Sequence, residues 1–565
     1  MLSSVTRIGN LVGDTKKKVE GYILAIVIDE NNIFSGIEIE QFQMEKKSIY
    51  LYKERDSKGN KPAPIAPINV KNPEKTLKKI KRWLNACIQN TSLRDEEKKL
   101  IKSVSDTLEN HSQKIIDSLK NKINELYRKE TKFLTIKLEN GRKYLGDYEV
   151  FKKSYNYISS QKIQKSSAKN ETCSICGEIK DYVSARTFVY NFDTDDKPGF
   201  IYEFNIENFW KNFPVCQECR GLLKRGRDFI DSKLTFKFYG LKYQIIPKTI
   251  FNEKETIKEI IDILSDTQKS ISLKERIIKR LTDDENEIFE YISEKRDVVS
   301  FNLLFLQTKQ SAERILLLIE DVLPSRIKKI FEAKDAVDST FGEEFNFGKI
   351  RTFFYKSDDE KRNSDLDKYF LEIVDSVFKG KKLDFSFLTK FFMKTIRREF
   401  IKDSFYLPRI KDAMMCTSFF EKLNLISFKE VLMEQNIFET IFTKYGKSLN
   451  NSATRGIFLL GVLTQMLINK QSSGRDSKPF MKKLKSLRME EKDIKALLPK
   501  VVNKLEEYDS FDKGKKIIAQ EASRYLLEAG HCWRIPIDEI NFYFVCGMNL
   551  SEEIANIVYS KEEKG

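Results

Sequence analysis

The chain has 565 residues, of which 41% are hydrophobic and 33% are charged. This composition is typical of a soluble protein with several globular domains, and it excludes a disordered chain. The longest apolar run, residues 456–468, is too short to cross a bilayer, and the first residues lack the layout of a signal peptide. A cytoplasmic protein without a membrane partner is therefore expected.

The formal net charge of +16 indicates a polyanionic partner such as nucleic acid. A lysine-rich codon bias in an AT-rich genome would give the same total. The clustering of the cations therefore has to decide between the two explanations.

Residues 1–150 are predicted to form an α+β domain. Alternating patterns predict strands at 22–28, 37–40, 49–52 and 133–137. Between them, the apolar period over residues 73–130 predicts two long helices that are separated near residues 90–92.

Residues 151–170 are lysine-rich, carry no acid and contain several Ser, Asn and Gln, which predicts a mobile loop. Its lysines are candidates for phosphate contacts, with Tyr155 and Tyr157 as stacking faces for bases. The nucleic-acid-binding candidates here are Lys152, Lys153, Lys162 and Lys165. A solvated linker is the alternative interpretation.

Two Cys-x-x-Cys pairs follow, formed by Cys173 with Cys176 and by Cys216 with Cys219. Four thiolates are the ligand set of a closed structural zinc site, and Gly177 suits the tight turn of a zinc knuckle. A helix predicted over residues 217–233 would carry the second pair, as in a treble-clef layout. Two unrelated thiol pairs remain the alternative.

Within the predicted helix, Arg220, Lys224 and Arg227 have the spacing of one helix face. This cationic stripe is a predicted contact surface for a nucleic-acid backbone. Together with residues 151–170 it places a basic zinc module at residues 151–250.

Residues 251–427 are predicted to form a mixed region that becomes helical, and residues 428–565 a helical bundle. The mixed region should contain helices over 253–296, a strand at 298–307 and a helix from 311 onward. The bundle has a second cationic patch suited to phosphates, formed by Lys478, Lys482, Lys483, Lys485 and Arg488. The predicted fold class is therefore α+β and multidomain.

The sequence favours a protein that is not an enzyme. Its two histidines, His111 and His531, are too few for a His-Asp metal-nuclease cluster, and it has no P-loop motif. The acidic pairs at 195–196, 283–284 and 358–359 have the sequence context of turns or caps.

Three segments together resemble the large subunit of type I-B CRISPR Cascade complexes. They are the opening Met-Leu-Ser-Ser-Val-Thr-Arg-Ile-Gly-Asn-Leu-Val, the central Cys-x-x-Cys-Gly…Cys-x-x-Cys-Arg-Gly-Leu, and the ending Ile-Asn-Phe-Tyr-Phe-Val-Cys-Gly-Met-Asn-Leu from residue 540. The resemblance spans the whole chain and implies a subunit without catalytic activity that carries a structural Zn2+.

The resemblance further implies binding to CRISPR RNA and target DNA, recognition of the protospacer-adjacent motif, stabilisation of the R-loop and recruitment of a separate helicase–nuclease. Its other partners would be the backbone and small subunits of Cascade. The C-terminal bundle resembles the small subunit, and Met433 is a candidate internal start for a separate small subunit.

Three alternatives remain open at this point. The chain could be a zinc-containing nucleic-acid-binding subunit of another bacterial assembly, or a structural scaffold whose basic surface reflects codon bias. A degenerate type III polymerase–cyclase subunit would require a Gly-Gly-Asp-Asp motif, which the sequence lacks.

Overall fold

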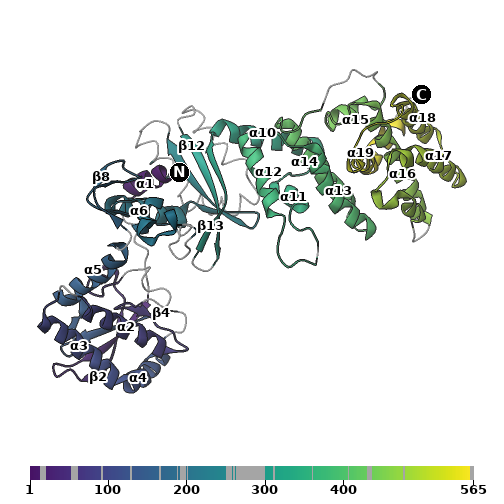
Figure 1. The fold of residues 1–565 in the computed structure, drawn as a ribbon. Coiled ribbons are helices and arrows are strands. Elements are labelled where there is room, and N and C mark those ends of the chain that lie inside the picture. The colour runs from purple at the N-terminus through teal and green to yellow at the C-terminus, as the bar shows by residue number, and fades with distance from the viewer. Residues whose placement is uncertain are drawn as a thin grey trace. The chain divides into compact units, whose positions relative to one another are not determined.

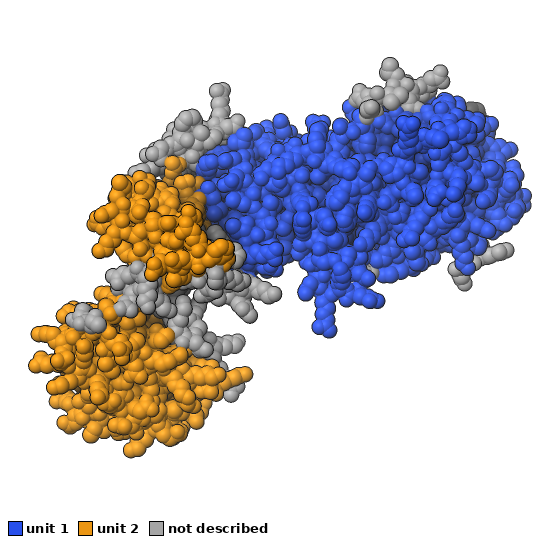
Figure 2. Space-filling model, viewed as in Figure 1, with its two compact units in different colours: residues 1, 230–565 blue, residues 2–229 orange. Residues whose placement is uncertain are grey.

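The computed structural model contains two compact units, which consist of residues 2–229 and of residue 1 with residues 230–565 (Figure 2). The structure describes residues 1–12, 21–52, 62–90, 93–126, 130–164, 167–187, 189–190, 199, 201–249, 258, 261, 299–309, 312–358, 360–404, 406–428, 436–474 and 478–559. The predicted boundaries at residues 150, 250 and 427 stay a prediction. The predicted helices over 253–296 and Met433 lie outside the described residues, apart from residues 258 and 261.

A mixed sheet forms the centre of the first domain. Strand β1 (Gly21–Ile28) pairs antiparallel with β2 (Phe34–Gln41) and parallel with β4 (Thr131–Leu138). Two short strands, β3 (Ala66–Pro67) and β5 (Lys143–Tyr144), also pair with β4. The strands predicted at 22–28, 37–40 and 133–137 are confirmed.

Each face of this sheet is buried. Leu24 and Ile26 point to the side of helices α2 (Pro73–Ile88), α3 (Asp95–Asn110) and α4 (Ser112–Asn124), whereas Ile23 and Ala25 belong to a second core with Tyr50. The predicted break near residues 90–92 is confirmed, and a second break at His111 divides the predicted second helix into α3 and α4.

The strand predicted at 49–52 is wrong. Residues 48–51 form a turn after the short helix η1 (Met44–Lys46), and Leu51 has a positive φ of 55°. This turn places Tyr50 over the sheet, where its ring packs 4.9 Å from that of Tyr144. The alternating aromatic residues at 49–52, which predicted a strand, instead belong to a turn that packs on the sheet.

The mobile loop predicted over 151–170 is also wrong. Helix α5 (Glu149–Gln164) covers most of it, after the short helix η2 (Leu145–Asp147). Phe151 is fully buried, and Tyr155 and Ile158 pack against the same core. These three residues have helical spacing, so burial of their face orders the segment.

The first helix of the chain, α1 (Leu2–Leu11), packs on α6 (Gln217–Lys233) across two glycines, Gly9 and Gly226 (Figure 1). Helix α6 has the bounds that the sequence predicted. Between α5 and α6 the chain forms short strands β6 (Ser167–Ala168), β7 (Glu171–Thr172), β8 (Ile179–Lys180) and β9 (Val183–Ser184) and short helices η3 (Ala185–Thr187), η5 (Tyr202–Phe204) and η6 (Ile206–Asn212).

The second unit begins with an antiparallel sheet in the order β10-β11-β12-β13. The strands are β10 (Thr235–Phe238), β11 (Leu241–Thr249), β12 (Val299–Lys309) and β13 (Ala312–Val322). The strand predicted at 298–307 is confirmed, but the helix predicted from 311 is wrong because β13 occupies that segment. Its continuous apolar centre fits a strand or a helix, so periodicity alone does not separate the two.

Among the described residues, the sheet is followed by α10 (Pro324–Phe341), α11 (Phe347–Phe353), α12 (Asp367–Lys379), α13 (Phe385–Ile401) and α14 (Tyr406–Lys422). Their core is aromatic, with the rings of Phe345 and Phe419 4.6 Å apart and those of Phe353 and Phe392 4.7 Å apart. The Phe-rich segments are therefore core elements.

The C-terminal helices surround α16 (Ser452–Gly474), which is buried along most of its length. The other elements are α15 (Glu439–Lys444), η7 (Pro479–Leu487), α17 (Glu491–Glu507), α18 (Lys513–Glu528), α19 (Ile537–Asn549) and α20 (Ser551–Tyr559). The α+β fold class is confirmed. Within the described residues, no helix is both long enough and apolar enough to span a membrane.

Candidate metal centre and nucleic-acid interface

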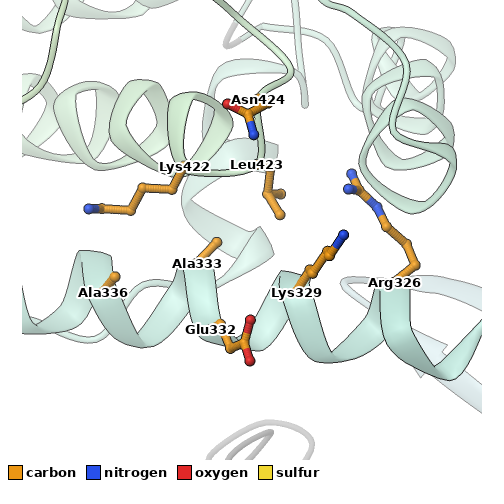
Figure 3. A pocket seen from close by; sticks show the side chains of 8 residues that line it. All are labelled: Arg326, Lys329, Glu332, Ala333, Ala336, Lys422, Leu423 and Asn424. Carbon is orange, nitrogen blue, oxygen red and sulfur yellow. The ribbon is translucent and has the colours of Figure 1, made fainter.

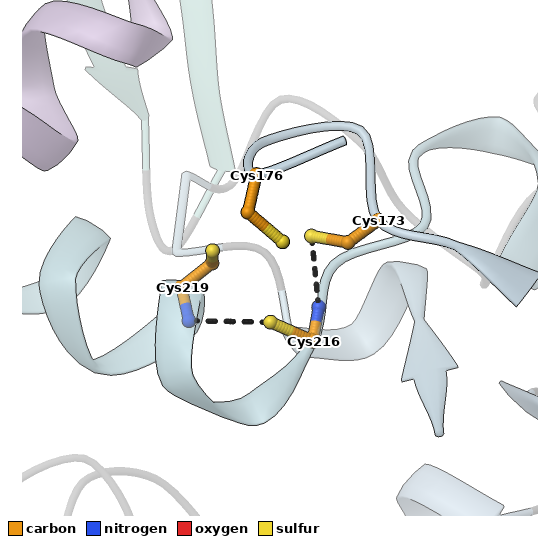
Figure 4. A group of neighbouring side chains, drawn as sticks. All are labelled: Cys173, Cys176, Cys216 and Cys219. Atoms are coloured by element: carbon orange, nitrogen blue, oxygen red, sulfur yellow. Dashed lines mark hydrogen bonds between the residues drawn. The ribbon is translucent and has the colours of Figure 1, made fainter. Parts of the chain in front are cut away.

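The structure brings the four predicted cysteines together (Figure 4). The sulfur atoms of Cys173, Cys176, Cys216 and Cys219 all lie within 4.8 Å of one another. Cys176 is exposed, and the other three thiols are buried. Residues from two segments that are forty positions apart thus form one thiol cluster.

Backbone hydrogen bonds fix the first pair in a knuckle. The Gly177 N–H donates to the Cys173 carbonyl at 2.9 Å, and the Cys173 N–H donates to the Glu178 carbonyl at 2.9 Å. Gly177 has a φ of 73°, which favours glycine and confirms the predicted tight turn.

The second pair lies at the start of α6. The Cys216 N–H points at the Cys173 sulfur at 3.4 Å, and the Cys219 N–H points at the Cys216 sulfur at 3.5 Å. Amide donors aimed at sulfur stabilise thiolates, as in structural metal sites.

The thiols strongly affect one another. Burial raises the pKa of Cys173, but backbone N–H groups of Cys176, Cys216 and Ile175 outweigh it and lower that pKa to about 7. Burial and the adjacent Cys216 and Cys173 raise the pKa of Cys219. Four thiolates in this space repel each other, so a bound cation would be needed to hold them all ionised.

The cluster fits a tetrahedral zinc ion. Zinc–sulfur bonds of about 2.3 Å require sulfurs about 3.8 Å apart, which is compatible with a cluster within 4.8 Å. All four donors are thiols, so the set has no open position for substrate and fits a structural ion. Zinc itself remains a prediction.

An ion-pair bridge connects the knuckle to α6. The Lys180 ammonium lies 2.7 Å from a Glu178 carboxylate oxygen and 3.0 Å from one of Glu218. The two carboxylates raise the pKa of Lys180. This lysine is therefore engaged within the module.

The predicted cationic stripe on α6 is wrong in one member. Arg227 is only 5% exposed, and its guanidinium lies 4.1 Å from the centre of the Tyr190 ring. Arg220 is partly buried and Lys224 is exposed. Arg227 lies on nearly the same helix face as Arg220, but its side chain is buried beside the Tyr190 ring.

The lysines predicted to contact nucleic acid from 151–170 lie on α5. Lys152 pairs with Glu149 at 2.8 Å, and Lys153 pairs with Glu97 of α3 at 3.4 Å. The side chain of Lys162 and the whole of Lys165 lie outside the described residues. The described members have carboxylate partners within the domain.

The C-terminal cationic patch is mixed. Lys478 pairs with Asp403 at 2.9 Å and Lys485 with Asp493 at 2.6 Å. Lys482, Lys483 and Arg488 are exposed. Their role in nucleic-acid binding stays a prediction.

Another basic group was missed. Arg326, Lys329 and Lys422 line one cavity between α10 and the end of α14. No sequence pattern joins Lys422 to the other two, so only the fold reveals the group.

The fold and the thiol cluster define a multidomain α+β protein with a four-cysteine knuckle. Three domain models of one family match the chain in order: the N-terminal domain of CRISPR-associated protein TM1802 matches residues 1–156, the central domain residues 170–322 and the C-terminal domain residues 345–562. The chain belongs to this family of CRISPR-associated proteins. No curated protein matches it.

Proposed function

We propose that this protein is the large subunit of a type I-B CRISPR surveillance complex of the Cascade kind. The observation that carries the proposal is the ordered match of three CRISPR-associated domain models along the chain. The resemblance of both ends and the cysteine motif to type I-B large subunits supports the finer assignment. The match argues against the alternative that the chain is a nucleic-acid-binding subunit of an assembly unrelated to CRISPR.

In this role the protein binds target DNA and CRISPR RNA in the cytoplasm. It helps recognise the protospacer-adjacent motif, stabilises the R-loop and recruits a separate helicase–nuclease. Base pairing with the guide reads the target sequence, and protein contacts read the flanking motif and the backbone. Its protein neighbours are the backbone and small subunits.

The subunit acts without catalysing a reaction. The candidate zinc site has four cysteine donors, a set that holds a fold together and leaves no position for substrate. The sequence contains only two histidines, so few imidazole side chains could serve as metal ligands or general bases. DNA cleavage therefore requires the separate helicase–nuclease.

Reconstitution of the complex with and without this chain tests the proposal. The complete complex should select one flanking motif from a DNA library with randomised flanks, and cleavage should appear only when the helicase–nuclease is added. Selection that persists without the chain would contradict the proposed role. Cleavage by the complex alone would contradict the absence of catalysis.

The proposed internal start needs its own test. Met433→Leu should abolish a shorter C-terminal product in cells that carry the gene, while the full-length chain persists. A small subunit that still starts near this position would exclude Met433 as its start.

A further inference from the structure

A groove of about 420 Å³ lies between α10 and the end of α14 (Figure 3). Ala333, Ala336 and Leu423 give it an apolar lining. Arg326 and Lys329 extend from α10 toward the side of Leu423 and Asn424, which follow α14. Glu332 points away from these two residues. The volume falls in the range of about 300–1,000 Å³ that is usual for ligand sites.

Two acids lie near the cations of the groove, because Glu332 lines it and the charge of Lys422 acts on the neighbouring Glu421 carboxylate. Within the described part of the chain, Arg326, Lys329 and Lys422 form no ion pair with a carboxylate. The Arg326 guanidinium donates from Nε and Nη2 to the Val377 carbonyl at 2.8 and 2.5 Å, which satisfies donors without neutralising charge. Burial lowers the pKa of Arg326.

A further cation lies beside the groove. The Lys382 ammonium donates to the carbonyl of Asn424, a groove residue, at 2.7 Å, and it too has no carboxylate partner among the described residues. Several positive charges thus lie around one hollow lined by a single acid, Glu332, and the ammonium groups of Lys329 and Lys422 point to opposite sides of it (Figure 3). Their mutual repulsion would be relieved by an anion.

This arrangement differs from some of the basic residues that the sequence singled out, although Lys482, Lys483 and Arg488 are exposed. Lys152, Lys153, Lys478 and Lys485 all pair with carboxylates. The unpaired cations over an apolar lining instead indicate a binding site for a phosphate-bearing ligand.

We propose that the groove binds the sugar–phosphate backbone of a single nucleic-acid strand. Separate phosphates of the strand lie at Lys329 and at Lys422, and the sugar between them lies on Ala333 and Leu423. An acidic peptide would carry its charges on flexible side chains, whereas a phosphodiester joins each charge to a compact sugar that the lining fits. This inference rests on the proposed function, since it assigns one contact of the nucleic-acid strand.

The test compares wild-type chain with Lys329→Gln/Lys422→Gln in fluorescence anisotropy with labelled oligothymidylate of about 20 nucleotides. At about 50 mM salt the double variant should bind roughly tenfold more weakly. The slope of log affinity against log salt should fall by about 1.4, the value for two lost contacts to a single strand. A methylphosphonate strand, which lacks the charges, should remove the difference between the proteins.

The matched control is Lys368→Gln/Lys492→Gln, which removes the same charge from lysines with side chains 81% and 76% exposed. It should keep wild-type affinity and slope. Equal weakening in both variants, or none in the groove variant, would overturn the groove assignment and leave the proposed function standing. A wild-type chain that ignores the strand at low salt would overturn both.

Discussion

Gly9 of α1 and Gly226 of α6 lie against each other where the two helices cross. A Cβ atom added to Gly226 would lie 1.9 Å from the Val5 carbonyl oxygen, and one added to Gly9 would lie 1.9 Å from the Leu222 carbonyl oxygen. The Arg225 Nε also donates to the Gly9 carbonyl at 3.0 Å. The crossing therefore depends on backbone contact that any larger residue would prevent.

Gly226→Ala should destabilise the cysteine module by about 1–3 kcal/mol, because the clash is with backbone and the helices must separate. Calorimetric unfolding of the full chain measures the change. Gly221→Ala on the same helix is the control, since the nearest atom to a Cβ added there would be Arg225 Nη1 at 3.9 Å. It should be neutral or slightly stabilising. A Gly226 variant as stable as the Gly221 variant would refute the close crossing.

Cys219→Ser should remove the bound metal. Elemental analysis of the purified wild-type chain should find about one zinc ion per chain, and the variant should hold almost none because a closed site needs all four thiolates. A chelator should lower the melting temperature of the wild-type chain more than that of the variant. Cys532→Ser, at an exposed thiol outside the cluster, should keep the zinc. Metal in the Cys219 variant would exclude this site.

Arg455→Met should destabilise the C-terminal helices. The Arg455 guanidinium binds both oxygens of Glu439 at 2.9 and 3.0 Å, and its side chain is 6% exposed. Glu439 is 27% exposed, so we expect a loss of about 2–3 kcal/mol, below that for a fully buried pair.

Arg524→Met is the matched control for Arg455. Arg524 lies over the Tyr525 ring and pairs with Glu521 and Glu528, but 33% of its side chain is exposed, against 6% for Arg455. The Arg524→Met substitution should lower the free energy of unfolding, measured with urea, by less than about 1 kcal/mol. Equal losses in the two variants would mean that burial of Arg455 adds nothing.

Glu539→Gln should stabilise the chain at neutral pH. Burial raises the pKa of Glu539, Asp384 and Asp538 raise it further, and the hydrogen bond from Ser386 lowers it. Because the folded pKa is the higher one, the folded state is favoured below the unfolded pKa and loses this contribution as pH rises. The variant avoids that loss.

Melting curves from about pH 4 to 8 test the Glu539 prediction. The advantage of the variant should be largest at neutral pH and should shrink as the pH falls toward the unfolded pKa of glutamate. Glu506→Gln, at an exposed position of α17, should show no such trend. A constant difference across the range would show that ionisation of Glu539 is not the cause.

The sequence predicted the features that depend on local patterns. The alternation in β1, the bounds of α6 and the four cysteines were all readable because each signal lies within a few residues or has a fixed ligand spacing. Composition misled where burial decided the outcome. Residues 151–164 look polar, yet Phe151 and Tyr155 fix them as a helix.

The basic residues were harder to interpret, because charge at one position says nothing about its partner. Lys153 is paired by Glu97, which lies on another helix, and Arg227 is buried against Tyr190. Conversely, Lys329 and Lys422 line one groove only through the packing of α10 and α14. Such pairings depend on tertiary contacts that no local period encodes.

The crossing of α1 and α6 has a consequence for how the protein is made. A ribosome releases α1 long before it has translated Gly226, so the nascent helix has to wait for its partner while the sheet domain between them emerges. Contacts this distant in the chain form slowly, and the apolar face of α1 stays open meanwhile. Chaperone contact during synthesis would matter most for this helix.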